Sequence, residues 1–244
     1  MSAKQVEKEL RSLANPAKSK ILSRFFKTGK GQYGEGDIFL GITVPVQRKV
    51  AERFRELTLI EIQKLLSNLV HECRLTALEI LVMQYEHAKK EKNEVVQNRI
   101  ITFYLKNTKY INNWDLVDLS ASYILGDYLL NNKDAKINRK ILYKLVESRN
   151  LWERRISIIS TAAFIRANEF ADTLKLANIL LTDTHDLMHK AVGWMLREVG
   201  KKDEKVLVKF LDAHVQEMPR TMLRYAIEKF PEAKRQAYLK SSHK

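Results

Sequence analysis

Apolar residues recur every three or four positions along most of the chain, which is the spacing of amphipathic helices. The pair Asn15-Pro16 forms an N-cap and first turn, and opens a helix that runs to Phe25. Thr58-Leu-Ile-Glu61 fits the capping-box pattern, and Val44-Pro45 marks another helix start because proline suits a first turn. No run of residues alternates convincingly as a strand does. The pattern therefore predicts an all-α fold.

Five segments of the chain share a short opening followed by a small or apolar run. They are HECRLTALEIL, DLVDLSASYIL, WERRISIISTA, LMHKAVGWMLR and RTMLRYAIEKF. Alignment places Arg74, Asp118, Arg155, Lys190 and Arg224 in one column, with separations of 44, 37, 35 and 34 residues. This period is typical of antiparallel helix pairs stacked as a superhelical, HEAT-like solenoid. Four of the five column residues are cationic, so we expect a basic concave face on which Asp118 is the only acid of the column.

One irregular segment interrupts the helical pattern. Residues 27–41, KTGKGQYGEGDIFLG, hold five of the eight glycines of the chain, and no Gly-Lys-Ser/Thr ending identifies a Walker loop. The segment is either a long loop that needs positive φ angles, or a loop whose Lys27, Lys30 and Tyr33 meet a phosphate backbone. We expect residues 1–244 to form one domain that carries this Gly-rich loop.

The charge composition of the chain indicates a polyanionic partner. The chain has 244 residues and a net charge of +14, which favours nucleic-acid binding over a merely solvated basic surface. The chain has neither an apolar run of membrane-spanning length nor a secretory signal. Its single cysteine, Cys73, cannot form an internal disulfide. We therefore expect a cytoplasmic, bacterial-type setting, with the protein on the nucleoid when it binds DNA.

The stretch NNWDLVDLS, residues 112–120, holds the first candidate chemistry. Trp114 and Asp118 are four residues apart and share one face of a helix. Asn113 is a plausible N-cap, and Asp115 then lies in the first turn, where a carboxylate complements the helix dipole. For Asp118 the ordinary alternative is a salt bridge to a neighbouring cation of the column.

A second tryptophan lies on the same side of its helix as the column. Trp194 follows Lys190 by four residues, and Gly193 beside it permits close approach of another backbone or a ligand. Burial in the core is the common alternative for such a tryptophan. Trp152 is better explained by core or interhelical packing. Tryptophan and arginine along a positive groove would suit stacking and cation–π contacts with a nucleic acid.

Other enzyme classes have little support in the chain. His185 and His189 have a spacing that metal ligands use, but the residues around them lack an HExxH-type pattern. No Ser-His-Asp neighbourhood or GxSxG turn is present, and Cys73 lies in a helical apolar pattern. We therefore expect no metal site.

The chain resembles the AlkD family of DNA alkylation-repair glycosylases, which are built from HEAT-like repeats. The resemblance extends over most of the sequence. The motifs that carry it are FLGITVP (39–45), NWDLVDLSASYILGDYL (113–129), NLWERR (150–155) and HKAVGWMLREVGK (189–201). A WDxVD element followed about 70 residues later by KAxGWxLRE is more specific than any single residue.

The resemblance implies residue roles and an activity. Trp114, Asp118 and Trp194 would surround the deoxyribose of the damaged nucleotide, with both indoles packed on the sugar and the carboxylate facing the anomeric carbon. Arg155 would contact the DNA backbone near the lesion. The family removes cationic N3- and N7-alkylpurines from duplex DNA, without a metal or cofactor and without inserting the base into a pocket.

The chain departs from the family pattern at two places. The stretch TGKGQYGEGD replaces a much shorter connection. The resemblance also suggests an aromatic facing DNA near Phe25, which here is a phenylalanine without a hydroxyl, and no specific role is assigned to it. The expected protein is a monofunctional alkylpurine DNA glycosylase of base excision repair, acting as a monomer on alkylated double-stranded DNA. The alternatives are a non-catalytic repeat protein for branched or distorted DNA and a scaffold for acidic polypeptides. The proposed phosphate contacts are Arg155, Arg74, Lys190, Arg224, Lys27 and Lys30.

Overall fold

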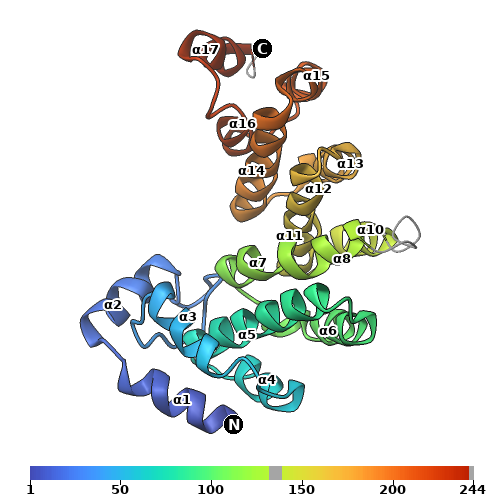
Figure 1. The fold of residues 1–244 in the computed structure, drawn as a ribbon. Helices are drawn as coiled ribbons and strands as arrows, with labels where there is room; N and C mark the ends of the chain where they lie inside the picture. Colours follow the sequence, from blue (N-terminus) through green and yellow to red (C-terminus); the bar gives the residue numbers. More distant parts are fainter. Residues whose placement is uncertain (132–138, 242–244) are drawn as a thin grey trace. The chain divides into compact units, whose positions relative to one another are not determined.

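The computed structural model describes residues 1–131 and 139–241, and this part of the chain divides into two compact units. Unit 1 comprises Met1–Ser120 and unit 2 comprises Ala121–Lys244 (Figure 1). The expectation of a single domain over residues 1–244 stays a prediction, and each unit is described by itself.

Unit 1 is helical, and its longest irregular stretch lies between α2 and α3. The elements are α1 (Ala3–Ser12), α2 (Pro16–Phe25), α3 (Val44–Arg53), α4 (Leu59–Leu66), α5 (His71–Lys90), α6 (Glu94–Lys106), the 3₁₀ turn η1 (Thr108–Tyr110) and α7 (Trp114–Ser120).

The helix starts predicted in unit 1 are confirmed, with one difference in detail. Asn15 caps α2 by accepting the N–H of Lys18 at 3.0 Å. Thr58 accepts the N–H of Glu61 at 3.4 Å, which is one half of a capping box. The other half is missing because the Glu61 carboxylate accepts the N–H of Ala3 at 2.7 Å instead. The side chain therefore ties α4 to the start of α1.

Helix α5 is the core of unit 1. It packs against α1, α3, α4, α6 and α7 (Figure 1). Even polar side chains of α5 are buried, among them Glu72, Arg74 and Glu79. A helix covered on nearly all sides must satisfy such groups inside the protein. For Glu79 the neighbour is Arg48 of α3, with Nε 3.4 Å from Oε1.

Unit 2 is built from shorter helices. They are the π-turn η2 (Ser122–Gly126), α8 (Asp127–Asn131), α10 (Lys140–Val146), α11 (Leu151–Ser160), α12 (Ala162–Arg166), α13 (Ala171–Ile179), the 3₁₀ turn η3 (Leu180–Thr182), α14 (Asp186–Lys202), α15 (Glu204–His214), α16 (Arg220–Ala226) and α17 (Glu232–Ser241).

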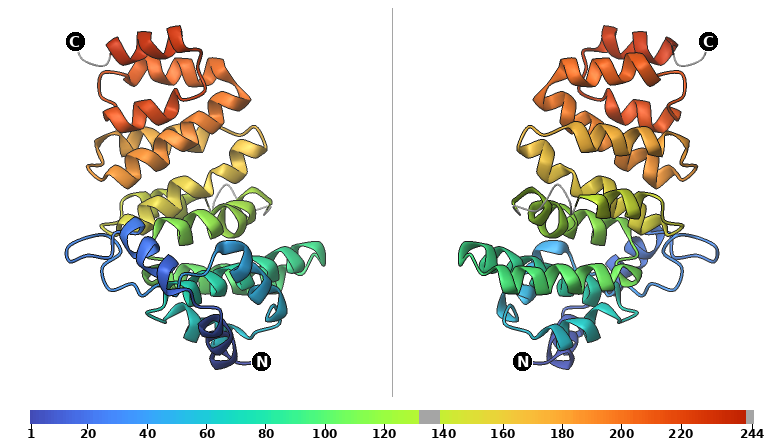
Figure 2. Two further views of the ribbon diagram at one scale, coloured as in Figure 1. Left: turned by 90° about the vertical axis from the view of Figure 1, so that its left-hand side faces the viewer. Right: turned by 90° about the vertical axis from the view of Figure 1, so that its right-hand side faces the viewer.

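The helices of unit 2 lie in successive layers, as the two side views show (Figure 2). α10 packs on α11, α11 on α14, and α14 on both α15 and α16. α14 and α15 follow each other directly, with only Asp203 between them.

The all-α class is confirmed for the described residues, in which one isolated β-bridge joins Ile38 to Val70. The expectation of positive φ angles in the Gly-rich loop is also confirmed, at Gly31, Gly36 and Gly41 and at Lys27. In residues 1–131 and 139–241 no helix is long and apolar enough to cross a lipid bilayer.

Candidate active site

The start of α7 is held by Asn113, whose side chain is fully buried. Its Oδ1 accepts the N–H of Trp114 at 2.8 Å, and its Nδ2 donates to Asp37 of the Gly-rich loop at 3.3 Å. The helix begins directly after Asn113 as predicted, but the Asn113 side chain bonds the N–H of the first helical residue, whereas an N-cap side chain accepts from the second or third. One side chain joins the loop to the start of the helix.

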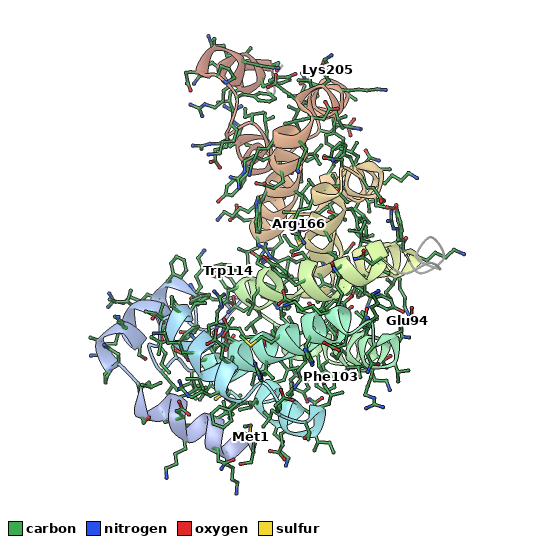
Figure 3. All side chains as sticks on the ribbon, viewed as in Figure 1. Met1, Glu94, Phe103, Trp114, Arg166 and Lys205 are labelled. Carbon is green, nitrogen blue, oxygen red and sulfur yellow. The ribbon has the colours of Figure 1, made fainter. Side chains whose placement is uncertain are left out.

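The indole of Trp114 is half-buried and belongs to a stack of rings. It lies almost parallel to Phe26 at 5.2 Å between centroids, and Phe25 meets its edge at 5.9 Å. Behind Phe26 lie Phe39 at 4.9 Å and then His71, 4.5 Å from Phe39. Such contacts orient an aromatic side chain more strictly than area burial alone. Figure 3 labels Trp114 at the start of α7.

Asp115 has a specific partner in addition to the helix dipole. Its Oδ2 lies 2.7 Å from Nε2 of His71, and the other imidazole nitrogen, Nδ1, lies 3.1 Å from Oδ2 of Asp37. Burial alone would lower the pKa of His71, but the charge and hydrogen bond of Asp115, with the hydrogen bond of Asp37, raise it to about 9. His71 is therefore a buried cation at neutral pH.

Asp37 has a second cationic partner, Arg74. Nη2 of Arg74 lies 2.6 Å from Oδ1 of Asp37, and its Nη1 donates to the carbonyl of Asn68 at 2.9 Å. Burial alone would raise the pKa of Asp37, but its hydrogen bond with His71 and the charge of Arg74 hold it below its ordinary value. Arg74 is only 4% exposed, so its guanidinium faces this carboxylate rather than solvent.

The segment 39–42 at the end of the loop is anchored by Glu72, whose side chain is fully buried. One carboxylate oxygen, Oε1, accepts the N–H groups of Leu40 at 3.0 Å, Gly41 at 2.8 Å and Ile42 at 3.3 Å. Gly41 has φ +85°, and a Cβ there would lie 2.2 Å from the carbonyl oxygen of Asn15. The FLGI part of the motif is thus a bound turn pressed against the start of α2.

An apolar cavity of about 410 Å³ opens between α2, this turn and the start of α3. Phe25, Phe26 and Phe39 line it, and the side chains of His71 and Asp115 form part of its wall. Phe25 is 61% exposed. The aromatic stack therefore has one face in the protein and one face open to a partner.

Asp118 lies one turn after Trp114 on α7 and is half-buried. Burial raises the pKa of the nearby Tyr104 hydroxyl, and the negative charge of Asp118 adds to that rise. The Tyr104 hydroxyl lies 3.0 Å from Oγ of Ser120. The structure thus brings Trp114 and Asp118 to one side of α7, as their spacing predicts.

The remaining predicted residues lie in unit 2 or on the loop. Trp194 of α14 is half-buried beside Gly193, where a Cβ would lie 2.5 Å from the carbonyl oxygen of Met222. The close approach expected at Gly193 is therefore made by another backbone, that of α16. Trp152 is buried, which confirms its packing role.

The predicted phosphate contacts differ in exposure. Arg224, Lys27 and Lys30 are exposed, and Lys190 forms an ion pair with Asp186 at 2.8 Å. Arg155 is 5% exposed, and its Nη1 donates to the carbonyl of Leu187 at 2.6 Å. Among the described residues no group of three His, Cys, Asp or Glu side chains is placed to hold a metal ion.

Comparison with known proteins identifies the family. The family model described as DNA alkylation repair enzyme matches residues 6–230. The chain belongs to this family. The predicted resemblance to DNA alkylation-repair proteins is thereby confirmed, and membership assigns the chain a role in the repair of alkylated DNA, with DNA as its substrate.

A solved structure supports the fold. It is a predicted DNA alkylation repair enzyme from Enterococcus faecalis, with a TM-score of 0.66 and 15% sequence identity over 90% of this chain and 97% of that chain. At this identity the likeness shows the fold, and it confirms the predicted solenoid-like all-α class. No curated protein matches the chain.

Proposed function

We propose that the protein is a DNA glycosylase that hydrolyses the N-glycosidic bond of cationic alkylated purines in duplex DNA. The observation that carries the proposal is the pair Trp114 and Asp118 on successive turns of α7, in a member of the alkylation-repair family. Trp194 of unit 2 is proposed to complete the site. All three residues would stabilise the positive charge that develops on the deoxyribose as the base leaves.

The chemistry matches these residue types. An alkylpurine with a formal positive charge leaves with the electron pair of its bond to C1′ and becomes neutral, while positive charge develops on the deoxyribose. The Asp118 carboxylate stabilises that charge and orients the attacking water, whose proton it accepts or passes to solvent. The electron-rich faces of the indoles favour the same cation. Because the base leaves as a neutral molecule, no group has to protonate it.

The frame around Trp114 supports the proposal. The ring is packed against Phe26 on one side and is only half-buried, so part of the indole is accessible to a sugar. The proposed phosphate contacts are Arg155, Lys190, Arg224, Lys27 and Lys30. A guanidinium has five N–H donors, so the bond from Arg155 to Leu187 does not prevent a phosphate contact. Arg74 is left out of this set because Asp37 engages it in unit 1.

The test is release of N7-methylguanine from duplex DNA under single-turnover conditions. We expect release by the protein, and a loss of roughly 100-fold or more in Asp118→Asn, because a charge-stabilising group contributes about that much. Glu56→Gln, which removes an exposed carboxylate of the same unit, is the matched control and should release base at the unchanged rate.

Three other outcomes would revise the proposal. Binding of the duplex without any release would favour the non-catalytic DNA-binding alternative. Failure to bind DNA in a salt-dependent manner would favour a protein scaffold. Full activity of Asp118→Asn would show that the enzyme assignment holds while the role given to the carboxylate is wrong.

A further inference from the structure

The proposed reaction uses Trp114 and Asp118, but it assigns no role to the buried charges beside them. His71, Asp37 and Asp115 are nearly or partly buried, with side-chain exposures of 2%, 6% and 16%. Burying charged groups is costly, and a packed apolar core at the same place would avoid that cost. The cost of burying these three charged side chains indicates that they position neighbouring parts of the protein.

His71 is joined to Trp114 by two separate routes within unit 1. One route is polar, from Nε2 to the carboxylate of Asp115, the residue directly after Trp114. The other is aromatic, from the imidazole through Phe39 and Phe26 to the indole. Movement of His71 would therefore disturb both the backbone start of α7 and the ring packed on Trp114.

The two carboxylate contacts favour donation from both imidazole nitrogens, although Nδ1 also lies 3.4 Å from Nη2 of Arg74. Each nitrogen faces a carboxylate oxygen, Asp37 at 3.1 Å and Asp115 at 2.7 Å, and an ionised carboxylate can only accept. A neutral imidazole has one N–H, so it would leave one of these contacts unmade. The imidazolium satisfies both at once.

Each element packed around His71 contributes a charge to this balance. α7 supplies Asp115, and the Gly-rich loop supplies Asp37. α5 itself supplies Arg74, which opposes protonation, and Glu72, whose carboxylate is bound to loop amides. Lys18 of α2 lines the same cavity. The two carboxylates that contact the imidazole raise the pKa of His71 by more than burial and Arg74 lower it.

We propose that His71 is a positioning residue that, as an imidazolium, sets the orientation of Trp114 and couples it to the Gly-rich loop through Asp37. The inference rests on the proposed function only for its effect on catalysis. The positioning of the indole is a property of the folded chain and can be measured without DNA.

The indole N–H signals in ¹H–¹⁵N spectra provide that measurement, because the chain has three tryptophans and each signal can be assigned by a Trp→Phe variant. We expect the Trp114 signal to shift as pH rises through about 9, while the signals of Trp152 and Trp194 stay in place. His71→Gln should abolish this transition. Asp37→Asn should move its midpoint to lower pH because one of the two carboxylates that stabilise the imidazolium is lost.

The second measurement is base release from N7-methylguanine duplex. His71→Gln should lower kcat by roughly 10- to 100-fold with KM little changed, because misplacement of a catalytic group by about 1 Å costs up to that much. His87→Gln is the control, since His87 is an exposed histidine on the same helix. It should behave as the unmodified protein in both measurements.

Two results would overturn the inference. One is a Trp114 signal that neither titrates near pH 9 nor moves in His71→Gln. The other is an equal shift of all three indole signals, which would mean that His71 acts on the stability of the whole fold. Absence of base release by the unmodified protein would refute the proposed function alone, and the spectra would still decide the role of His71.

Discussion

At the scale of single residues, the Glu79 carboxylate is a buried acid whose surroundings favour its neutral form. Burial raises the pKa of Glu79 to about 7, and the nearby charge of Arg48 offsets only part of this rise. The pKa in the folded chain thus exceeds the value of an unfolded glutamate, about 4.3. The folded state is therefore stabilised by protonation of Glu79, and it loses this contribution as pH rises from about 4.5 to about 7.

The prediction is a pH-dependent gain in stability from Glu79→Gln. The amide keeps the size of the side chain without the charge, so the variant should unfold at higher urea concentration than the unmodified protein at pH 8. The gain should be at most about 3 kcal/mol and should vanish near pH 4.5. Glu56→Gln, at an exposed site of the same unit, should show no such dependence. A loss of stability at pH 8 would mean that the charged pair with Arg48 is the favoured state.

Single residues also show why the sequence predicts some parts of the candidate site and not others. Trp114 and Asp118 are four positions apart on one helix, so their shared face follows from local periodicity. The pairing of Asp115 with His71 and of Asp37 with Arg74 joins positions 44 and 37 residues apart. No local pattern encodes such contacts. The sequence therefore predicts only a helix-dipole role for Asp115, and it predicts that Arg74 faces DNA.

At the scale of helices, the contact of α14 with α16 depends on one missing side chain. Gly193 is buried in α14, and a Cβ there would lie 2.5 Å from the Met222 carbonyl oxygen and from Cβ of Tyr225. Neither neighbour is the flexible end of a side chain. The two helices can approach this closely only with glycine at position 193.

Gly193→Ala should therefore destabilise the protein by about 1–3 kcal/mol, the range for overpacking of a dense interior. Gly200→Ala on the same helix is the comparison, because its added Cβ would meet Cδ2 of Leu207, the movable end of a side chain. Alanine also favours a helix by up to about 1 kcal/mol over glycine. Urea denaturation of both variants checks the difference. Equal stability would show that α16 can move away at little cost.

Helix boundaries were the most predictable part of the fold. Asn15-Pro16 and Val44-Pro45 are local signals, and helices α2 and α3 begin where these signals indicate. The π-turn η2 has no such signal. It is defined by the bond from the Gly126 N–H to the Ala121 carbonyl at 2.9 Å, and a Cβ on Gly126 would lie 2.1 Å from the Ser160 carbonyl oxygen. Its location depends on packing within unit 2.

At the scale of the whole molecule, the net charge of +14 should dominate the binding of DNA. Each phosphate contact releases counterions, so the logarithm of the association constant falls linearly with the logarithm of the salt concentration, by about 0.9 per contact. Loss of the exposed pair Lys27 and Lys30 should therefore reduce the slope by about 1.8.

The comparison is between Lys27→Gln/Lys30→Gln and Lys4→Gln/Lys8→Gln, measured by titration of a duplex between 50 and 200 mM salt. Both double variants remove two exposed charges, but Lys4 and Lys8 lie on α1, away from the loop. Only the loop variant should change the slope. Equal slopes in the two variants would show that these loop lysines are solvated, which was the other reading of the Gly-rich segment.

The carboxylate of Glu72 has a consequence for protein engineering. It fixes residues 40–42, while Gly31 and Gly36 have open space where a Cβ would be. The loop therefore has a permissive tip and a restrictive base. A peptide tag or a fluorescent label introduced next to Gly31 should leave the core of unit 1 intact, whereas Gly34 is buried and a Cβ there would lie 2.4 Å from the carbonyl oxygen of Phe26. The same insertion between positions 39 and 42 would break the turn that connects the aromatic stack to α3.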